Sequence, residues 1–209
     1  MIPISGLQSF STVDYPGLHS CVLFAQGCPW RCRYCHNTEL QKFDSAHLLS
    51  QWDLFENFLQ RRRMLLDAVV FSGGEVTAHS NLKVAMSRVK KLGFKVGLHT
   101  AGVYPTRFME VLECVDWVGF DVKAPFDERY EKITGIKNSH KIARESLEYL
   151  LDSKVAFQLR CTVHPLLLGE GDVDYLRKQL RSLRSDLVLK IQLFNIKGCK
   201  DEELLAQCP

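Results

Sequence analysis

The sequence predicts an α/β fold, a single-domain open partial (β/α)6 barrel. Short apolar runs alternate with segments of helical periodicity along nearly the whole chain, which is typical of parallel strands joined by helices. Six such units in 209 residues are too few for a closed eight-stranded barrel, whereas a three-quarter barrel fits this length. The composition, 46% hydrophobic and 24% charged, is that of an ordinary globular domain.

Six strands are expected where apolar, β-branched and aromatic residues cluster between turn signals. They cover residues 20–26, 68–72, 95–100, 115–122, 155–163 and 187–194. Five helices are expected between them, because apolar side chains recur there at helical spacing. These helices cover residues 52–59, 84–92, 106–114, 143–151 and 173–183. Gly93 is expected to cap the second helix, and Pro105 to precede the third.

The chain divides into a core and two short ends. Residues 20–195 form the partial-barrel core, and residues 1–19 form an N-terminal hairpin or lid with Asp14-Tyr15-Pro16-Gly17 as its turn. Residues 196–209 form a short polar C-terminal tail with room for one helical turn.

Charge and cysteine content restrict the partners and the compartment. The net charge of +3 is too small to imply a nucleic-acid partner. No apolar stretch is long enough to cross a bilayer, and the N-terminus lacks a signal pattern. Eight cysteines without a secretion signal favour a reducing compartment. We therefore expect a cytoplasmic protein with neither a nucleic-acid nor a membrane partner.

Three cysteines lie within eight residues directly after the first strand: Cys28, Cys32 and Cys35. A structural zinc or a closed iron–sulfur cluster needs four protein ligands, so three thiolates on a four-iron cluster leave one iron open for chemistry. A zinc site with His36 as fourth ligand is an alternative, although adjacent Cys35 and His36 would have to turn toward one metal. Ordinary core cysteines or disulfides are a second alternative.

Polar residues and glycines also lie at the ends of the next four strands or directly after them. Because functional groups of such folds gather at the carboxyl ends of the strands, these residues are expected to converge with the cysteine loop. They are Gly73, Gly74 and Glu75, then His99 and Thr100, then Asp121 and Lys123, and finally His164.

The cysteine loop, the glycine pair and the Asp-x-Lys step together resemble the radical SAM superfamily, whose members cleave S-adenosylmethionine (SAM) reductively. The spacing Cys28-x3-Cys32-x2-Cys35 matches the cluster motif of that superfamily, with an aromatic residue, Tyr34, before the third cysteine. The segment Cys32-Arg33-Tyr34-Cys35-His36-Asn37 resembles glycyl-radical-enzyme activases. The run from Gly6 through Pro16-Gly17 to Cys28 and Cys32 is most similar to the activating proteins of anaerobic ribonucleoside-triphosphate reductase, and pyruvate formate-lyase activating enzymes are near relatives.

The resemblance implies a role for each matching residue. Cys28, Cys32 and Cys35 ligate three irons of a 4Fe-4S cluster, and the amino and carboxylate groups of SAM chelate the fourth, open iron. The other residues carried over contact SAM. Tyr34 lies near the adenine, Gly73, Gly74 and Glu75 hold the methionine amino end, and Thr100, Asp121, Lys123 and His164 meet other polar groups. Arg160 is a further candidate, and for it and His164 a purely structural strand-end role stays open.

The resemblance also implies a reaction and its partners. One electron from the reduced cluster cleaves SAM, and the resulting 5′-deoxyadenosyl radical takes a hydrogen atom from a glycine of a glycyl radical enzyme, here anaerobic (class III) ribonucleotide reductase. A flavodoxin- or ferredoxin-type protein is the expected electron donor.

Several alternatives remain open from the sequence. They are an activase of the pyruvate formate-lyase type, a small-molecule radical SAM enzyme such as a 7-carboxy-7-deazaguanine synthase, a zinc-stabilised binding module, and a homologue without turnover. The chain has His99-Thr100-Ala101-Gly102 where related activases often have Asp-Thr-Asn-Gly. A monovalent-cation site that uses this Asp therefore stays open, as do the roles of Cys199 and Cys208.

Overall fold

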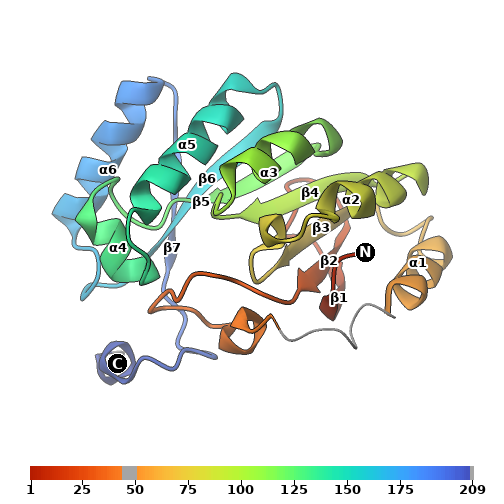
Figure 1. Cartoon of the computed structure of the whole chain (residues 1–209), viewed down its shortest axis with the longest axis horizontal. Coiled ribbons are helices and arrows are strands. Elements are labelled where there is room, and N and C mark those ends of the chain that lie inside the picture. Colours follow the sequence, from red (N-terminus) through yellow and green to blue (C-terminus); the bar gives the residue numbers. More distant parts are fainter. Residues whose placement is uncertain (44–50, 208–209) are drawn as a thin grey trace.

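The computed structural model describes residues 1–43 and 51–207 and contains one seven-stranded sheet (Figure 1). The strands follow one another across the sheet in chain order, and β2 to β7 are parallel. This arrangement confirms the predicted fold class, an open partial barrel. The strands are β1 (Ile4–Ser11), β2 (Ser20–Ala25), β3 (Ala68–Gly73), β4 (Lys95–Thr100), β5 (Trp117–Asp121), β6 (Ala156–Val163) and β7 (Leu189–Leu193).

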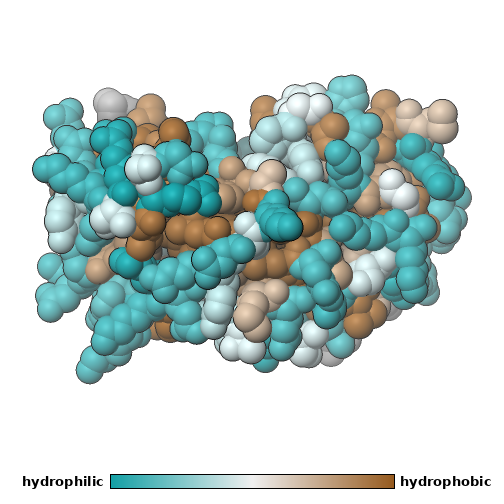
Figure 2. Space-filling view, turned by 90° about the horizontal axis from the view of Figure 1, so that it is seen from above, coloured by the Kyte–Doolittle hydropathy of each residue, from teal (hydrophilic) through white to brown (hydrophobic). Residues whose placement is uncertain are grey.

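The helices α2, α3, α5 and α6 lie along one face of the sheet (Figure 1). Seen from above, the surface is mostly hydrophilic, with hydrophobic residues gathered toward the middle of the view (Figure 2). No helix among the described residues is both long enough and apolar enough to cross a membrane. The helices are α1 (Trp52–Arg61), α2 (Leu82–Lys91), α3 (Pro105–Val111), α4 (Glu128–Thr134), α5 (Ser139–Asp152), α6 (Glu170–Leu183) and α7 (Glu202–Ala206).

Alternation along the strands builds two apolar clusters, one on each face of the sheet. In β3, Val69 and Phe71 belong to the large core beneath the helices, whereas Ala68 and Val70 belong to a small cluster on the inner face. Tyr15 and Trp117 complete that inner cluster, with ring centroids 5.4 Å apart. Tyr15 lies in the turn between β1 and β2, which pair antiparallel. The N-terminal turn therefore covers one end of the inner face.

The structure differs from the predicted elements in adding β1 as a seventh strand, in starting α5 at Ser139 and α6 at Glu170, and in the start of β5. That strand begins at Trp117 rather than Val115, because a short 3₁₀ helix, Leu112–Cys114, extends the preceding helix. Helix α4 was not predicted, since seven residues are too few to show a helical period. It is defined by its caps, with Asp127 accepting a hydrogen bond from the amide of Arg129 and Gly135 following at φ 71°.

Candidate functional site

A cavity of about 400 Å³ lies between the carboxyl ends of the strands and the cysteine loop, residues 26–37. Residues from all six parallel strands, β2 to β7, line it, as expected for parallel strands that end at one edge. Ten of the site residues expected from the sequence line it: Cys28, Cys32, Tyr34, Cys35, Gly73, Gly74, Glu75, Thr100, Asp121 and Lys123.

The cysteine loop is closed at its base by hydrogen bonds between its first residues and residues 39–42, which follow it. The side-chain amide of Gln26 donates to the carbonyl oxygens of Glu39 and Lys42, each at 2.8 Å. The Gly27 amide donates to the Leu40 carbonyl at 2.7 Å. Gln26 is 7% exposed, so these bonds are shielded from competing water. Gln26 is a site residue that was not predicted, although an amide side chain at the end of an apolar strand is a visible signal in the sequence.

All three cysteines line the same cavity, and the surroundings of Cys28 and Cys32 favour the protonated thiol when no metal is bound. Burial, assisted by the nearby Glu75 charge, raises the pKa of Cys28 to about 12. Burial likewise raises the pKa of Cys32 to about 11, against the opposing effect of Lys123. Metal binding here must therefore release protons. Within residues 1–43 and 51–207, no three His, Cys, Asp or Glu side chains already converge as a site for a single metal ion. The donor chemistry, three thiols beside an open cavity, fits an iron–sulfur cluster.

The glycine pair allows the end of β3 to pass directly beneath the start of the cysteine loop. The Gly74 amide donates to the Ala25 carbonyl at 2.9 Å, and the Glu75 amide donates to the Gly27 carbonyl at 2.8 Å. A Cβ atom on Gly74 would lie 2.3 Å from the Gly27 carbonyl oxygen, and Gly73 has a φ of +112°. Only glycine therefore permits this approach of the two backbones.

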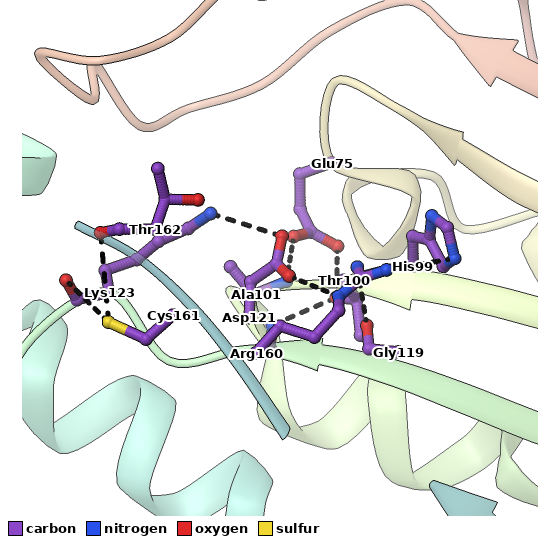
Figure 3. Close-up of polar contacts among 11 residues, drawn as sticks. Glu75, His99, Thr100, Ala101, Gly119, Asp121, Lys123, Arg160, Cys161 and Thr162 are labelled. Atoms are coloured by element: carbon purple, nitrogen blue, oxygen red, sulfur yellow. Dashed lines mark hydrogen bonds and ion pairs between the residues drawn. The ribbon is translucent and has the colours of Figure 1, made fainter. Parts of the chain in front are cut away.

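The Glu75 carboxylate is buried and held by four hydrogen bonds, and Figure 3 shows it beside Thr100 and Ala101. Its Oε1 accepts from the hydroxyls of Thr77 at 2.7 Å and Thr100 at 2.6 Å, and from the Thr77 amide at 3.1 Å. Its Oε2 accepts from the Ala101 amide at 3.0 Å and so retains acceptor capacity. Burial raises the pKa of Glu75 despite these bonds. These bonds fix the orientation of the carboxylate, and Thr100 contributes one of them.

Two cations share one carboxylate on the inner wall of the cavity (Figure 3). Asp121 Oδ1 accepts from Arg160 Nε at 2.9 Å, and Oδ2 accepts from Lys123 Nζ at 3.3 Å. Burial alone would raise the pKa of Asp121, but Arg160 and Lys123 outweigh it and hold that pKa well below its usual range. Burial lowers the pKa of Lys123, and Asp121 more than compensates. All three groups are therefore charged, and the wall carries a net positive charge suited to an anionic group.

Tyr34 lines the same cavity and carries a buried hydroxyl. It is 5% exposed, and its hydroxyl has no hydrogen-bond partner among the described residues. The ammonium of Lys123 lies 5.7 Å from the centre of its ring. A buried hydroxyl without a partner is costly, so it is a position where a bound ligand gains a hydrogen bond.

Arg160 contacts Asp121 through Nε and His99 through Nη1. The His99 imidazole is neutral at pH 7. Its Nε2 is 3.0 Å from the Asp14 carbonyl and 3.2 Å from Arg160 Nη1. Burial and the Arg160 charge lower the pKa of His99 to about 4, although Asp121 and Asp14 oppose this. At the position where related activases often have an aspartate, this chain therefore has an uncharged imidazole that contacts the Arg160 guanidinium.

The depressed pKa of His99 makes the stability of the fold pH-dependent. As the pH falls below 6.5, the ordinary value, the unfolded chain binds a proton at His99 that the folded chain takes up only near pH 4. The free energy of unfolding should therefore decrease by about 2 kcal/mol from pH 7 to pH 5 because of this group. Urea titrations at both pH values should show this loss, and His99→Gln should show a smaller one. Equal losses in both proteins would contradict the assignment.

The structure does not bring His164 to the cavity. His164 is 2% exposed, and its ring packs edge-on against Phe194 with centroids 5.0 Å apart. Its Nδ1 accepts from the Leu166 amide at 3.2 Å, and its carbonyl accepts from the amides of Leu167 and Leu168. The strand-end role left open for His164 fits this placement, because the side chain shapes the turn after β6. Arg160, by contrast, does line the cavity.

Comparison with known proteins gives matches over most of the chain. The model of the Radical SAM superfamily matches residues 22–177. A protein of Methanocaldococcus jannaschii named as a glycyl-radical enzyme activating enzyme is 32% identical over 206 residues, or 96% of this chain and 83% of that protein. The pyruvate formate-lyase 1-activating enzyme of Escherichia coli is 30% identical over 199 residues, or 91% of this chain and 78% of that enzyme.

A solved structure supports the fold independently of sequence. Streptococcus suis SuiB bound to its precursor peptide SuiA matches with a TM-score of 0.66 at 10% identity. The match covers 86% of this chain and 41% of that chain. At this identity, the likeness establishes a shared fold only.

Proposed function

The chain belongs to the radical SAM superfamily and is an enzyme related to the glycyl-radical activating enzymes, and we propose that it generates a glycyl radical on anaerobic ribonucleotide reductase. The observation that carries the activity is the meeting of Cys28, Cys32 and Cys35 with the Gly73-Gly74-Glu75 turn in one cavity. An activase for a pyruvate formate-lyase type enzyme fits the named relatives equally well.

The three thiols would hold a 4Fe-4S cluster, and the strand ends would hold SAM. When bound, the cluster supplies the electron that cleaves the sulfonium of SAM to methionine and a 5′-deoxyadenosyl radical, which takes a hydrogen atom from the partner's glycine. The Glu75 carboxylate, whose Oε2 retains acceptor capacity, is suited to the methionine ammonium. The positive wall of Asp121, Lys123 and Arg160 is suited to the methionine carboxylate.

The surrounding residues keep this site rigid and partly closed to water. Thr77 and Thr100 fix Glu75, and Gln26 closes the base of the cysteine loop. Tyr34 covers one side with a buried ring whose hydroxyl is free to bond a ligand. Such pre-formed geometry is what positions a reactive intermediate next to its target atom. A flavodoxin- or ferredoxin-type protein is the proposed electron donor.

The choice of partner is tested by electron paramagnetic resonance. The protein, loaded with iron and sulfide and reduced, is mixed with SAM and either anaerobic ribonucleotide reductase or pyruvate formate-lyase from the source organism. An organic radical on the reductase, absent when its radical-bearing glycine is replaced by alanine, supports the proposal. A radical on pyruvate formate-lyase alone would instead assign the chain to the other activases.

Replacing Lys123 by alanine should weaken SAM binding by about 10- to 100-fold, the range expected for loss of a charge-assisted hydrogen bond. Cluster content should not change, because Lys123 is no cluster ligand and Asp121 keeps its bond to Arg160. Equilibrium binding of SAM to the loaded protein measures the effect, with the exposed Lys178→Ala as control. Unchanged affinity for SAM would mean that Lys123 pairs with Asp121 but does not contact SAM.

A further inference from the structure

The C-terminal segment, residues 196–206, lies beside the cysteine loop although more than 160 residues separate them in the sequence (Figure 1). It leaves β7 and ends in helix α7. None of its residues was assigned to the site above, and no strand pairing joins it to the sheet. Its contacts with the loop are side-chain and backbone contacts around Arg33, between the second and third cysteines.

Arg33 is held by two carboxylates of this segment. Its Nε donates to Asp201 Oδ2 at 2.7 Å, and its Nη2 donates to Asp201 Oδ1 at 3.1 Å and to Glu203 Oε2 at 2.6 Å. Asp201 also starts α7, because its Oδ1 accepts from the Leu204 amide at 3.1 Å. Hydrogen bonding to Arg33 lowers the pKa of Asp201. Because two nitrogens of Arg33 bond the two oxygens of Asp201, the pair fixes the relative orientation of the two side chains as well as their distance.

Two further residues of the same segment, Gly198 and Cys199, lie against the backbone of the cysteine loop. The thiol of Cys199, which is 8% exposed, donates to the Arg33 carbonyl at 3.6 Å. A Cβ atom on Gly198 would lie 2.2 Å from the His36 carbonyl oxygen, and the φ of Gly198 is +81°. Any side chain at Gly198 must therefore push the segment off the loop. The other late cysteine, Cys208, lies outside the described residues.

Helix α4 holds the loop from another direction. The Arg31 amide donates to the Thr134 carbonyl at 2.8 Å, and the Arg33 amide donates to the Ile133 carbonyl at 3.0 Å. The loop around Cys32 is therefore fixed on two sides by protein contacts alone.

We propose that residues 196–206 form a clamp that holds the cysteine loop in its ligand-bearing conformation before a cluster binds, and that slows loss of the cluster afterwards. Arg33, Gly198 and Asp201 are its positioning residues. Holding the ligands in place before binding reduces the conformational entropy that binding must overcome. The part of the proposal that concerns the cluster rests on the proposed function, whereas the part that concerns the metal-free loop does not.

Hydrogen exchange of the metal-free protein tests the first part. Asp201→Asn removes the charge while keeping a good helix cap, and Gly198→Ala breaks a different contact of the same clamp. Peptides that contain residues 31–37 should exchange several-fold faster in both variants. Asp174→Asn, which removes an exposed ion pair with Arg177 in α6, far from the cysteine loop in sequence, should leave them unchanged. Unchanged exchange in both clamp variants overturns the proposal, whether or not the chain takes up iron.

Release of iron to a chelator under anaerobic conditions tests the second part. Loss of the visible absorbance should be about fivefold faster in Asp201→Asn, which corresponds to about 1 kcal/mol. Gly198→Ala should release iron faster as well, and Asp174→Asn should match the unmodified protein. Faster exchange with unchanged iron release overturns the retention part. If the unmodified protein takes up no iron, the proposed function fails. The hydrogen-exchange experiment then decides by itself whether residues 196–206 hold the metal-free cysteine loop in place.

Discussion

Replacing Cys32 by alanine is expected to abolish both cluster binding and cleavage of SAM. A four-iron cluster on three thiolates already lacks one protein ligand, so losing a second leaves two irons without protein anchorage. Iron and sulfide content after anaerobic loading should fall to background, and 5′-deoxyadenosine formation should fall by at least about a thousandfold.

The matched control for this variant is Cys114→Ala. Cys114 is another free cysteine, buried in the 3₁₀ helix before β5, where its sulfur contacts the Ser87 hydroxyl at 3.6 Å. This variant should keep a full cluster. An intact cluster spectrum in Cys32→Ala would contradict the assignment of the three cysteines.

Replacing Gly74 by alanine is expected to disrupt the site by steric overlap alone. Its Cβ would lie 2.3 Å from the Gly27 carbonyl oxygen and 2.9 Å from the Leu40 carbonyl oxygen. These are backbone atoms at the base of the cysteine loop, so no side-chain rotation can relieve the overlap. We expect a loss of stability of about 2–4 kcal/mol, or a displaced loop, and at least about a hundredfold weaker binding of SAM.

Gly171→Ala is the control for Gly74→Ala. Gly171 lies in the first turn of α6, and a Cβ there meets nothing within 4 Å. Alanine in a helix should be neutral or stabilising by up to about 1 kcal/mol. Denaturant titrations of the two variants, with SAM binding to the loaded protein, measure the contrast. A fully stable Gly74→Ala protein that binds SAM normally would contradict the close approach of β3 and the loop.

The fold and much of the cavity lining could be predicted because both follow from local patterns. Each strand is a short apolar run, and parallel strands bring their carboxyl ends to one edge. The residues after β3, β4 and β5, including Glu75, Thr100 and Lys123, therefore line one cavity together with the cysteine loop. His164 also follows a strand, but its ring turns toward Phe194. Position at a strand end does not decide the direction of a side chain.

The contacts that hold the site could not be predicted, because their partners are far apart in sequence and carry no repeated pattern. The bond between Arg33 and Asp201 spans 168 positions. The bonds from Gln26 to two carbonyl oxygens involve backbone atoms that every residue has. Such contacts depend on the folded path of the chain rather than on residue type.

The central claim, that this chain cleaves SAM reductively at a three-cysteine cluster, is tested most directly by measuring 5′-deoxyadenosine. The protein is loaded anaerobically with iron and sulfide and then given SAM with or without dithionite. We predict equal amounts of 5′-deoxyadenosine and methionine, formed only when dithionite is present. A loaded cluster that yields no 5′-deoxyadenosine, or stoichiometric zinc without sulfide in place of iron, would contradict the claim.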